Sequence, residues 1–450
     1  MRTTRSRTTR SRTSLILAGL STAAVLGTTP PTAATPPTAA DDARVAAAAV
    51  AGSNQLVALR AVDGAQATSK SRINGSATVA SADGRYVVFS TGSALVPEDT
   101  NRLDDVYRRD TVAGITTLVS TTANGRIGND YSVEPSISCG GRFVAFTSFA
   151  SNLVKDTNGH TLDVLVKDMS TGALRLVSRT SAGKQTGRNS FFPVIAGGGR
   201  YVAFQTFGRF GPRDQDRRED VYVHDRRRGT TRQVSLTPAG KDVRSGVLVG
   251  GISADGRKIT FGDDNSAWVR DRVAGRTTRF WHEPDDPSQP FPAGTVGRPV
   301  VSGDGRFVAF STRSRFVVDG DRGHLSDVFR LNLGTGRFVK VTVSRRGGNA
   351  NEESGIPSLS HDGRYVGFMS AATNLVAGDI PGVDVFVRDL RRGVTTQASV
   401  APDGTPGDED SGRNGVAISA DGQTLVYESY ARNLVPDDTN GWLDVFAWHR

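Results

Sequence analysis

The chain has 450 residues, of which 37% are hydrophobic, 22% charged and 7% aromatic, a mixture too apolar for an intrinsically disordered protein. The formal net charge is +9, but five arginines lie in residues 1–40, and the rest of the chain holds 50 basic and 46 acidic residues. This mixed surface charge argues against nucleic-acid binding, and no nucleic-acid partner is expected.

The first segment has the features of a secretory signal. An arginine-rich stretch, 1–13, precedes an apolar stretch, 14–27, which is too short to span a bilayer. We predict a signal peptide and processing region over residues 1–40 and a flexible linker over 41–51. The mature protein is then expected to be secreted, extracellular or cell-envelope associated, without stable membrane insertion; a retained signal anchor is the alternative.

A short motif recurs along residues 52–450. Its form is Ser-x-Asp-Gly-Arg followed by an apolar run that ends in an aromatic residue, as in Ser81–Arg85 before Tyr86–Phe89. The glycine at the fourth position of the motif stands at residues 84, 141, 199, 256, 305, 363 and 422; the second and third copies have Gly in place of Asp, and the seventh has Gln423 in place of Arg. Asp-Gly predicts a tight hairpin turn, because glycine accepts the positive φ of such turns.

Each repeat is predicted to form four antiparallel strands. The hairpin joins the first two strands, and segments such as Asp105–Asp110 and Ile115–Ser120 form the third and fourth. A four-stranded unit cannot bury both faces alone, whereas copies packed round a ring can. The last repeat ends after its third strand, Asp444–Trp448, and Gln55–Arg60 supplies the missing fourth. We therefore predict an all-β, seven-bladed β-propeller over 52–450, with the N-terminal strand closing the last blade.

These repeats resemble the TolB-like β-propeller repeat family, a WD-repeat-like group. The resemblance covers roughly residues 52–450 and rests on the seven hairpin motifs. It implies a propeller fold, although repeats of that family are commonly shorter and often number six. The separate N-terminal α/β domain of TolB has no counterpart in this sequence, so TolB's partners are not implied.

The connections between strands differ in length. The one–two and three–four turns are short, whereas the two–three and four–one loops are long in most repeats. Alternate connections of an antiparallel meander emerge on the same side, so the long loops are predicted to share one face. That face is the candidate binding surface, because loops on a rigid scaffold often carry function.

The long two–three loops carry aspartates and asparagines at alternating positions. Hard oxygen ligands in this pattern suit Ca2+, the one cofactor we consider. The alternative is that these side chains accept backbone N–H bonds and hold the loops in place. The candidate metal ligands are Asp99, Asn101 and Asp105 in the first repeat, Asp156, Asn158 and Asp163 in the second, Asp214, Asp216 and Asp220 in the third, and Asp438, Asn440 and Asp444 in the seventh.

The fourth repeat departs from this pattern. A tight hairpin, 261–268, replaces its two–three loop, and a long connection rich in Pro and Asp follows. Trp281, His282 and Asp285 could then line a notch that binds a peptide or a sugar. The alternative is ordinary divergence between repeats.

The sequence contains no Gly-x-Ser-x-Gly, His-Glu-x-x-His or phosphate-loop motif, and we predict no catalytic residue. The single cysteine, Cys139, cannot form an intrachain disulfide. The sequence favours a monomeric binding module whose long-loop face binds a protein, a peptide or a cell-envelope polysaccharide. A carbohydrate-active lyase or hydrolase and a calcium-stabilised structural module are the alternatives.

Overall fold

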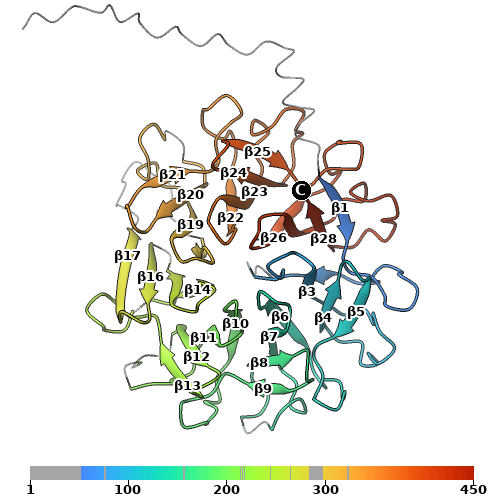
Figure 1. The fold of residues 1–450 in the computed structure, drawn as a ribbon, viewed down its shortest axis with the longest axis vertical. Helices are drawn as coiled ribbons and strands as arrows, with labels where there is room; N and C mark the ends of the chain where they lie inside the picture. Colours follow the sequence, from blue (N-terminus) through green and yellow to red (C-terminus); the bar gives the residue numbers. More distant parts are fainter. Residues whose placement is uncertain are drawn as a thin grey trace, which may run out of the picture. The chain divides into compact units, whose positions relative to one another are not determined.

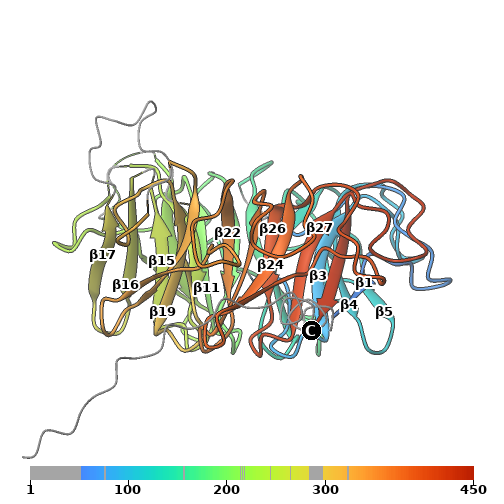
Figure 2. The same cartoon turned by 90° about the horizontal axis from the view of Figure 1, so that it is seen from above.

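The computed structural model describes residues 52–450, except 75–77, 156–157, 213, 215, 217, 244, 264, 283–296 and 322–323. The predicted signal peptide and linker lie outside the described residues. Seven four-stranded antiparallel sheets surround a central axis, which confirms the seven-bladed β-propeller (Figure 1). Figure 2 shows the same sheets from the side. In the described part of the chain, no helix is long and apolar enough to cross a membrane.

The strands follow the repeats in chain order. Blades 1 to 3 contain β2 (Ser71–Arg72), β3 (Tyr86–Thr91), β4 (Asp105–Asp110) and β5 (Ile115–Leu118); β6 (Ser132–Ile137), β7 (Phe143–Ser148), β8 (Asp163–Asp168) and β9 (Leu174–Leu176); and β10 (Ser190–Ile195), β11 (Tyr201–Thr206), β12 (Asp220–Asp225) and β13 (Thr230–Gln233). Blades 4 and 5 contain β14 (Leu248–Ile252), β15 (Lys258–Gly262), β16 (Ser266–Asp271) and β17 (Arg276–His282); and β18 (Val300–Val301), β19 (Phe307–Thr312), β20 (Asp327–Asn332) and β21 (Phe338–Lys340). Blades 6 and 7 contain β22 (Ser354–Leu359), β23 (Tyr365–Ser370), β24 (Asp384–Asp389) and β25 (Val394–Gln397); and β26 (Ser411–Ile418), β27 (Thr424–Ser429), β28 (Asp444–His449) and β1 (Ser53–Leu56).

Blade 7 joins the two ends of the propeller. Strand β1 pairs antiparallel with β28, with Asn54 opposite Trp448, so the predicted closure by the N-terminal strand is confirmed. The Asn54 amide also donates to the carbonyls of Ala398 and Val400 in blade 6, at 2.9 and 2.8 Å. The closing strand therefore holds blade 7 together and fastens it to its neighbour.

The core lies within and between the blades. The second strand of each blade contributes a buried aromatic residue, which faces a buried side chain of the third strand. In blade 1, Phe89 lies opposite Tyr107 with ring centroids 5.9 Å apart. Cross-strand aromatic pairs of this kind stabilise a sheet beyond the area they bury. Equivalent pairs are Phe204–Tyr222, Phe261–Trp268, Phe310–Phe329, Phe368–Phe386 and Tyr427–Phe446.

The glycine-containing one–two turns also form contacts between blades. Gly141 has a φ of 70°, and a Cβ placed on it would lie 2.2 Å from the ring of Tyr86 in the preceding blade. The guanidinium of Arg108 stacks on the same ring, 4.6 Å from its centroid, and donates to the carbonyl of Gly141 at 2.8 Å. This glycine is therefore required both by the turn and by the packing of its neighbour.

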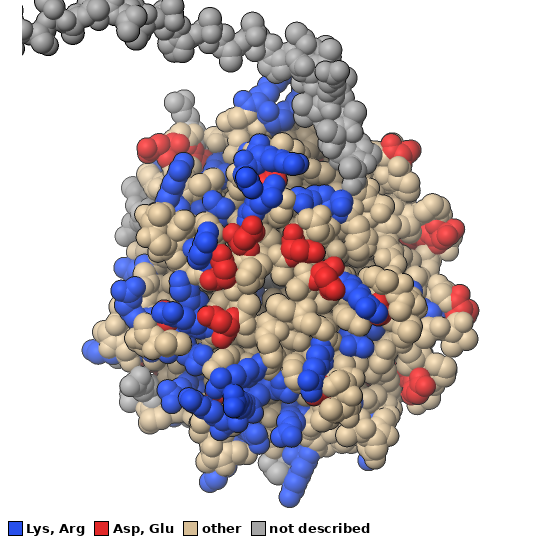
Figure 3. All heavy atoms as spheres, in the orientation of Figure 1, with Lys and Arg blue, Asp and Glu red and all other residues tan. Residues whose placement is uncertain are grey.

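The one–two turns are linked round the axis by backbone hydrogen bonds. Ala82, for example, donates to the carbonyl of Cys139 at 2.8 Å, and Cys139 donates to Gly197 at 3.0 Å. The chain ends on this face, because Arg450 donates its backbone N–H to Gln423 beside the last turn. The C-terminus faces the reader in Figure 1, and Figure 3 shows acidic side chains round the centre of this face. The long loops lie on the opposite face.

Candidate functional site

The main hollow of the described residues is the mouth of the central channel on the long-loop face. Its volume is about 950 Å3, and all seven blades contribute to its wall. The wall combines charged, amide, hydroxyl and apolar side chains. Among them are Arg72, Asn74, Glu134, Phe192, Arg298, Glu353, Asn414 and Tyr430.

The innermost strands are irregular where they reach this mouth. Glu134, Phe192 and Ile356 have φ values of 57°, 50° and 49°, and the strand register shifts beside each of them. A positive φ is unfavourable for residues with a Cβ, and a β-bulge turns side chains away from the regular ladder. Backbone strain of this kind is often found at functional sites.

Two carboxylates, the half-buried Glu134 and the buried Glu428, hold these irregular segments. The Glu134 carboxylate accepts the Thr147 hydroxyl and the Phe192 backbone N–H, both at 2.8 Å. Glu428 accepts the Asn414 amide at 3.0 Å and the Asn74 backbone N–H at 3.2 Å. Burial raises the pKa of both carboxyls, and their hydrogen bonds partly offset that rise.

Two arginines give the mouth positive charge. Arg298 lies with its guanidinium 3.8 Å from the ring centroid of Phe192. Burial lowers the pKa of Arg298, and the charge of Glu134 opposes that shift. Arg72 is exposed and lies within electrostatic range of Glu428. This site forms no recognisable motif in the sequence, because its residues come from seven separate repeats.

In blade 1 the predicted metal residues form hydrogen bonds that hold their own loop. The Asn101 amide donates to the Asp105 carboxylate at 2.8 Å, and the Asn101 side-chain oxygen accepts the Leu103 backbone N–H at 2.8 Å. Asp99 accepts the hydroxyl of Tyr107. Burial raises the pKa of Asp105 to about 7. Asp105 thus accepts hydrogen bonds from the Asn101 amide and from the Ser120 hydroxyl, the latter at 2.5 Å.

In blade 2, a glutamine side chain donates to the aspartate that begins the third strand. Gln185 donates to Asn158 at 3.0 Å and to Asp163 at 3.1 Å. Asp156 lies outside the described residues.

In blade 7, Gln66 donates to Asp438 at 3.4 Å, and the Asn440 amide donates to the carbonyl of Ala67 at 3.1 Å. Asp444 is buried, and burial raises its pKa to about 7.

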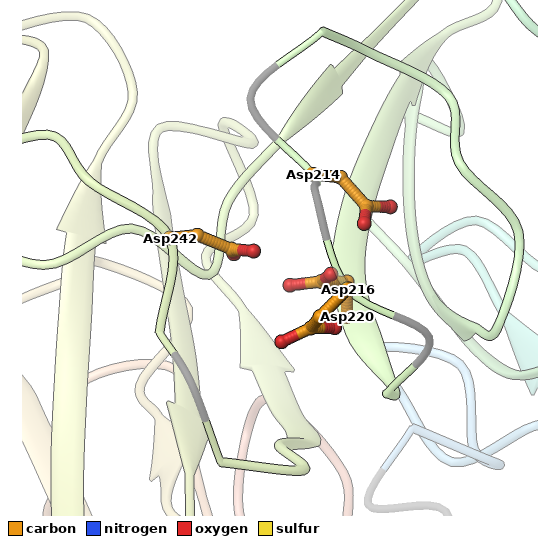
Figure 4. A group of neighbouring side chains, drawn as sticks. All are labelled: Asp214, Asp216, Asp220 and Asp242. Carbon is orange, nitrogen blue, oxygen red and sulfur yellow. The ribbon is translucent and has the colours of Figure 1, made fainter.

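Blade 3 differs, because an aspartate replaces the asparagine of this loop. Asp214, Asp216 and Asp220 gather with Asp242, a residue of the four–one loop that the sequence analysis did not include (Figure 4). One carboxylate oxygen of each lies within 4.8 Å of the others. Gln233 donates to Asp220 at 3.0 Å and to Asp242 at 2.6 Å. Burial raises the pKa of Asp220 to about 7.

Blade 5 places an ammonium group at the equivalent position. Lys340 occupies the place of Gln233 on the fourth strand, and its Nζ lies 3.1 Å from Asp321 and 2.7 Å from Asp327. It also donates to Asn349 at 3.0 Å. Blade 5 therefore neutralises its loop carboxylates with a cation, whereas blade 3 has more carboxylates and a neutral glutamine.

Of the residues predicted to line a notch in blade 4, Trp281 and His282 lie on its outermost strand. Trp281 packs against Phe310 and Phe338 of blade 5, with ring centroids 6.0 Å apart in each pair. The His282 ring is 2.9 Å from the Ser266 hydroxyl. Asp285 lies outside the described residues. Trp281 and His282 are not among the residues that line the channel mouth.

The opposite end of the channel is narrow and lined by small residues of the one–two turns, including Ala82, Cys139 and Gly197. Cys139 is a free, half-buried thiol, and burial raises its pKa. A thiol with a raised pKa is a weak nucleophile.

No family model matches the chain, and no curated protein matches its sequence. Many solved structures match its fold. A putative TolB from Agrobacterium tumefaciens is 14% identical, with 74% of this chain and 94% of that chain covered and a TM-score of 0.40. An oligogalacturonate lyase from Vibrio parahaemolyticus is 9% identical, with 88% and 91% covered and a TM-score of 0.50. An oligogalacturonate lyase in complex with manganese is 10% identical, with 88% and 97% covered and a TM-score of 0.51. These similarities concern the fold.

Proposed function

We propose that this propeller is a secreted, monomeric binding module whose ligand enters the channel mouth on the long-loop face. One observation carries this proposal: a hollow of about 950 Å3 is lined by side chains from all seven blades. A rigid concave site with a few converging polar groups is typical of ligand recognition. The classes of ligand that the sequence favours are a protein, a peptide and a cell-envelope polysaccharide.

Binding is favoured over catalysis by the environment of the carboxylates. Glu134 and Glu428 both accept backbone N–H groups that fix the neighbouring bulges. A general acid or base needs a carboxyl group that can reach the substrate. Glu428 instead supports the residues that face the channel, and Glu134, which lies on the channel wall, is already engaged by Thr147 and Phe192.

The proposal is tested by screening the full-length protein against arrays of cell-envelope glycans and peptides. Binding is expected to weaken at least tenfold in Arg72→Gln, which changes the channel mouth. The matched control is Arg126→Gln, which removes an exposed arginine that does not line the hollow. Absence of binding to every array, or equal loss in both variants, would contradict the proposal.

A second role, calcium binding in blade 3, is favoured by the four-aspartate cluster. Carboxylate oxygens are the ligands that Ca2+ prefers, and Asp214, Asp216, Asp220 and Asp242 offer four of them within reach of one ion. In blade 5, the ammonium group of Lys340 neutralises the loop carboxylates at the equivalent position. We propose that Ca2+ supplies this charge in blade 3 and stabilises the loop.

Thermal melting in excess Ca2+ and in excess chelator tests this role. Calcium is expected to raise the melting temperature, because a ligand of the folded state stabilises it by about 2.7 kcal/mol at a concentration of roughly 100 Kd. Gln233→Lys, which copies blade 5, is expected to raise the melting temperature in chelator and to abolish the response to calcium. Asp438→Asn in blade 7 is the matched control and should keep that response. An unchanged melting curve in wild-type protein would refute calcium binding.

A further inference from the structure

We infer that the channel mouth recognises a carboxylate-bearing oligosaccharide, with Arg298 holding the carboxylate. This inference rests on the proposed function and names its ligand class. Four features of the mouth carry it: the orientation of Arg298, the second arginine on the wall, the irregular backbone of the innermost strands, and a row of aromatic side chains beside the hollow.

Arg298 is held so that its N–H groups remain available. One flat face of its guanidinium covers the Phe192 ring at 3.8 Å. Stacking leaves the N–H edge free, and that edge matches the two oxygens of a carboxylate. Among the described residues, Glu134 is the charged group that acts on the pKa of Arg298, and no hydrogen bond or ion pair joins these two side chains. A half-buried cation of this kind is stabilised by an anionic ligand.

The surrounding charges also favour an anion. Glu134 accepts hydrogen bonds from Thr147 and Phe192, and its charge also acts on Arg298. Glu353 forms an ion pair with Arg313 at 2.6 Å. Arg72 adds a second positive charge on the wall. Two arginines thus face the hollow while its carboxylates have partners within the protein.

The backbone at the mouth disfavours a peptide as the ligand. A peptide commonly binds a propeller or sheet by extending a strand edge through regular hydrogen bonds. Here the register of the innermost strands shifts in blades 2, 3, 4, 6 and 7. The N–H groups of Phe192 and Asn74 are already donated to glutamates. The ligand must therefore be recognised by side chains of the channel wall. Polar side chains can form hydrogen bonds with the many hydroxyls of a sugar.

A row of aromatic rings continues from the mouth into blade 3. The rings of Phe191 and Phe192 have centroids 5.4 Å apart, and Phe191 and Phe207 lie 5.7 Å apart. Phe207 is exposed by 37%, so part of this row is open to solvent. Flat apolar rings beside polar groups offer a surface for the C–H faces of neighbouring sugar units. The row thus provides a path for more than one unit of a chain.

Titration calorimetry of the full-length protein tests the inference. The probes are uronic-acid oligosaccharides of four to six units and the same oligosaccharides as neutral methyl esters. The acid form is expected to bind at least tenfold more tightly than the ester. Arg298→Gln is expected to remove most of this difference, whereas the exposed control Arg126→Gln should preserve it. The ester comparison needs no variant, so it remains decisive if Arg298→Gln fails to fold.

The outcomes separate this inference from the proposed function. Equal binding of acid and ester, or binding only of peptides with a free carboxyl terminus, would overturn the inference and leave a binding module. Uronate binding that persists unchanged in Arg298→Gln would overturn the role of that arginine. Absence of binding to uronates, esters, glycan arrays and peptides would overturn the inference together with the proposed function.

Discussion

At the scale of single residues, equivalent positions in different blades can be compared directly. The aspartate that begins the third strand of a blade is buried in most blades, and a hydroxyl on the fourth strand usually donates to it. Ser178 donates to Asp163 at 2.6 Å, and Thr342 donates to Asp327 at 2.6 Å. In blade 7 the fourth strand comes from the N-terminal segment, and Ala58 occupies the place of the hydroxyl residue.

We predict that Ala58→Ser stabilises the protein most at alkaline pH. Burial raises the pKa of Asp444 to about 7, above its ordinary value of about 3.9. The stability that this carboxyl contributes is therefore complete below about pH 4 and is lost as the pH rises through about 7. A serine hydroxyl would donate to the ionised carboxylate and lower its pKa. Urea denaturation should show a gain of about 1 kcal/mol at pH 8 and a smaller gain at pH 5.

The control for this prediction is the same substitution in an Asp444→Asn protein. That background has no carboxylate to ionise, so the difference between the two pH values should vanish. An equal gain at pH 5 and pH 8 in the parent protein would show that the new hydroxyl acts through packing instead.

At the scale of elements, the one–two hairpin forms contacts within its own blade and with the neighbouring blade. Its arginine forms an ion pair with the aspartate at the end of the third strand, as in Arg142 with Asp168 at 2.7 Å. The Arg142 side chain is 53% exposed, so each such pair contributes little by itself. The aromatic residue after the arginine packs instead on the turn glycine of the next blade. Packing across the blade junction is therefore the larger contribution of this motif.

Gly141→Ala separates the two roles of the turn glycine. We expect a loss of about 3 kcal/mol, of which roughly 1 kcal/mol comes from the positive φ and the rest from displacement of the Tyr86 ring. Gly125→Ala is the matched control, because Gly125 has a φ of 84° but no atom within 4 Å of the added Cβ. It should cost about 1 kcal/mol. Guanidinium denaturation measures both values, and equal losses would show that contact between blades adds nothing.

At the scale of the whole propeller, stability depends on closing the ring. Strand β1 pairs with β28, and the Tyr427 hydroxyl donates to Asn54 at 2.7 Å. Leu56, Phe446 and Trp448 belong to the same buried cluster. Without β1, this cluster and the edge of β28 would face solvent, which favours association with other chains.

We predict that removal of residues 1–60 opens the propeller, whereas removal of residues 1–45 leaves it closed. Strand β1 begins at Ser53, so the shorter deletion spares it. Size-exclusion chromatography and thermal melting should show a monomer with an unchanged transition for the shorter deletion. The longer deletion should give aggregates or a broad transition at lower temperature. A sharp, unchanged transition after the longer deletion would show that blade 7 is stable with three strands.

The sequence by itself determined the architecture, because the residues that form each hairpin lie next to one another in the chain and recur in every repeat. Seven glycine turns before apolar runs, five of them Asp-Gly and two Gly-Gly, fix the hairpins, and the missing last strand identifies its substitute near the N-terminus. The sequence also marked Asp214, Asp216 and Asp220 as candidate ligands, since their alternation is visible within one loop.

Only the tertiary structure decided which of these residues meet and what the ring encloses. Asp242 joins the blade 3 cluster from another loop, and Asn101 turns its amide toward Asp105 in blade 1. Arg298 and Phe192 belong to different repeats and meet only because the ring is closed. The physical reason is that a hairpin depends on adjacent residues, whereas a site on the axis depends on the curvature produced by packing all seven blades.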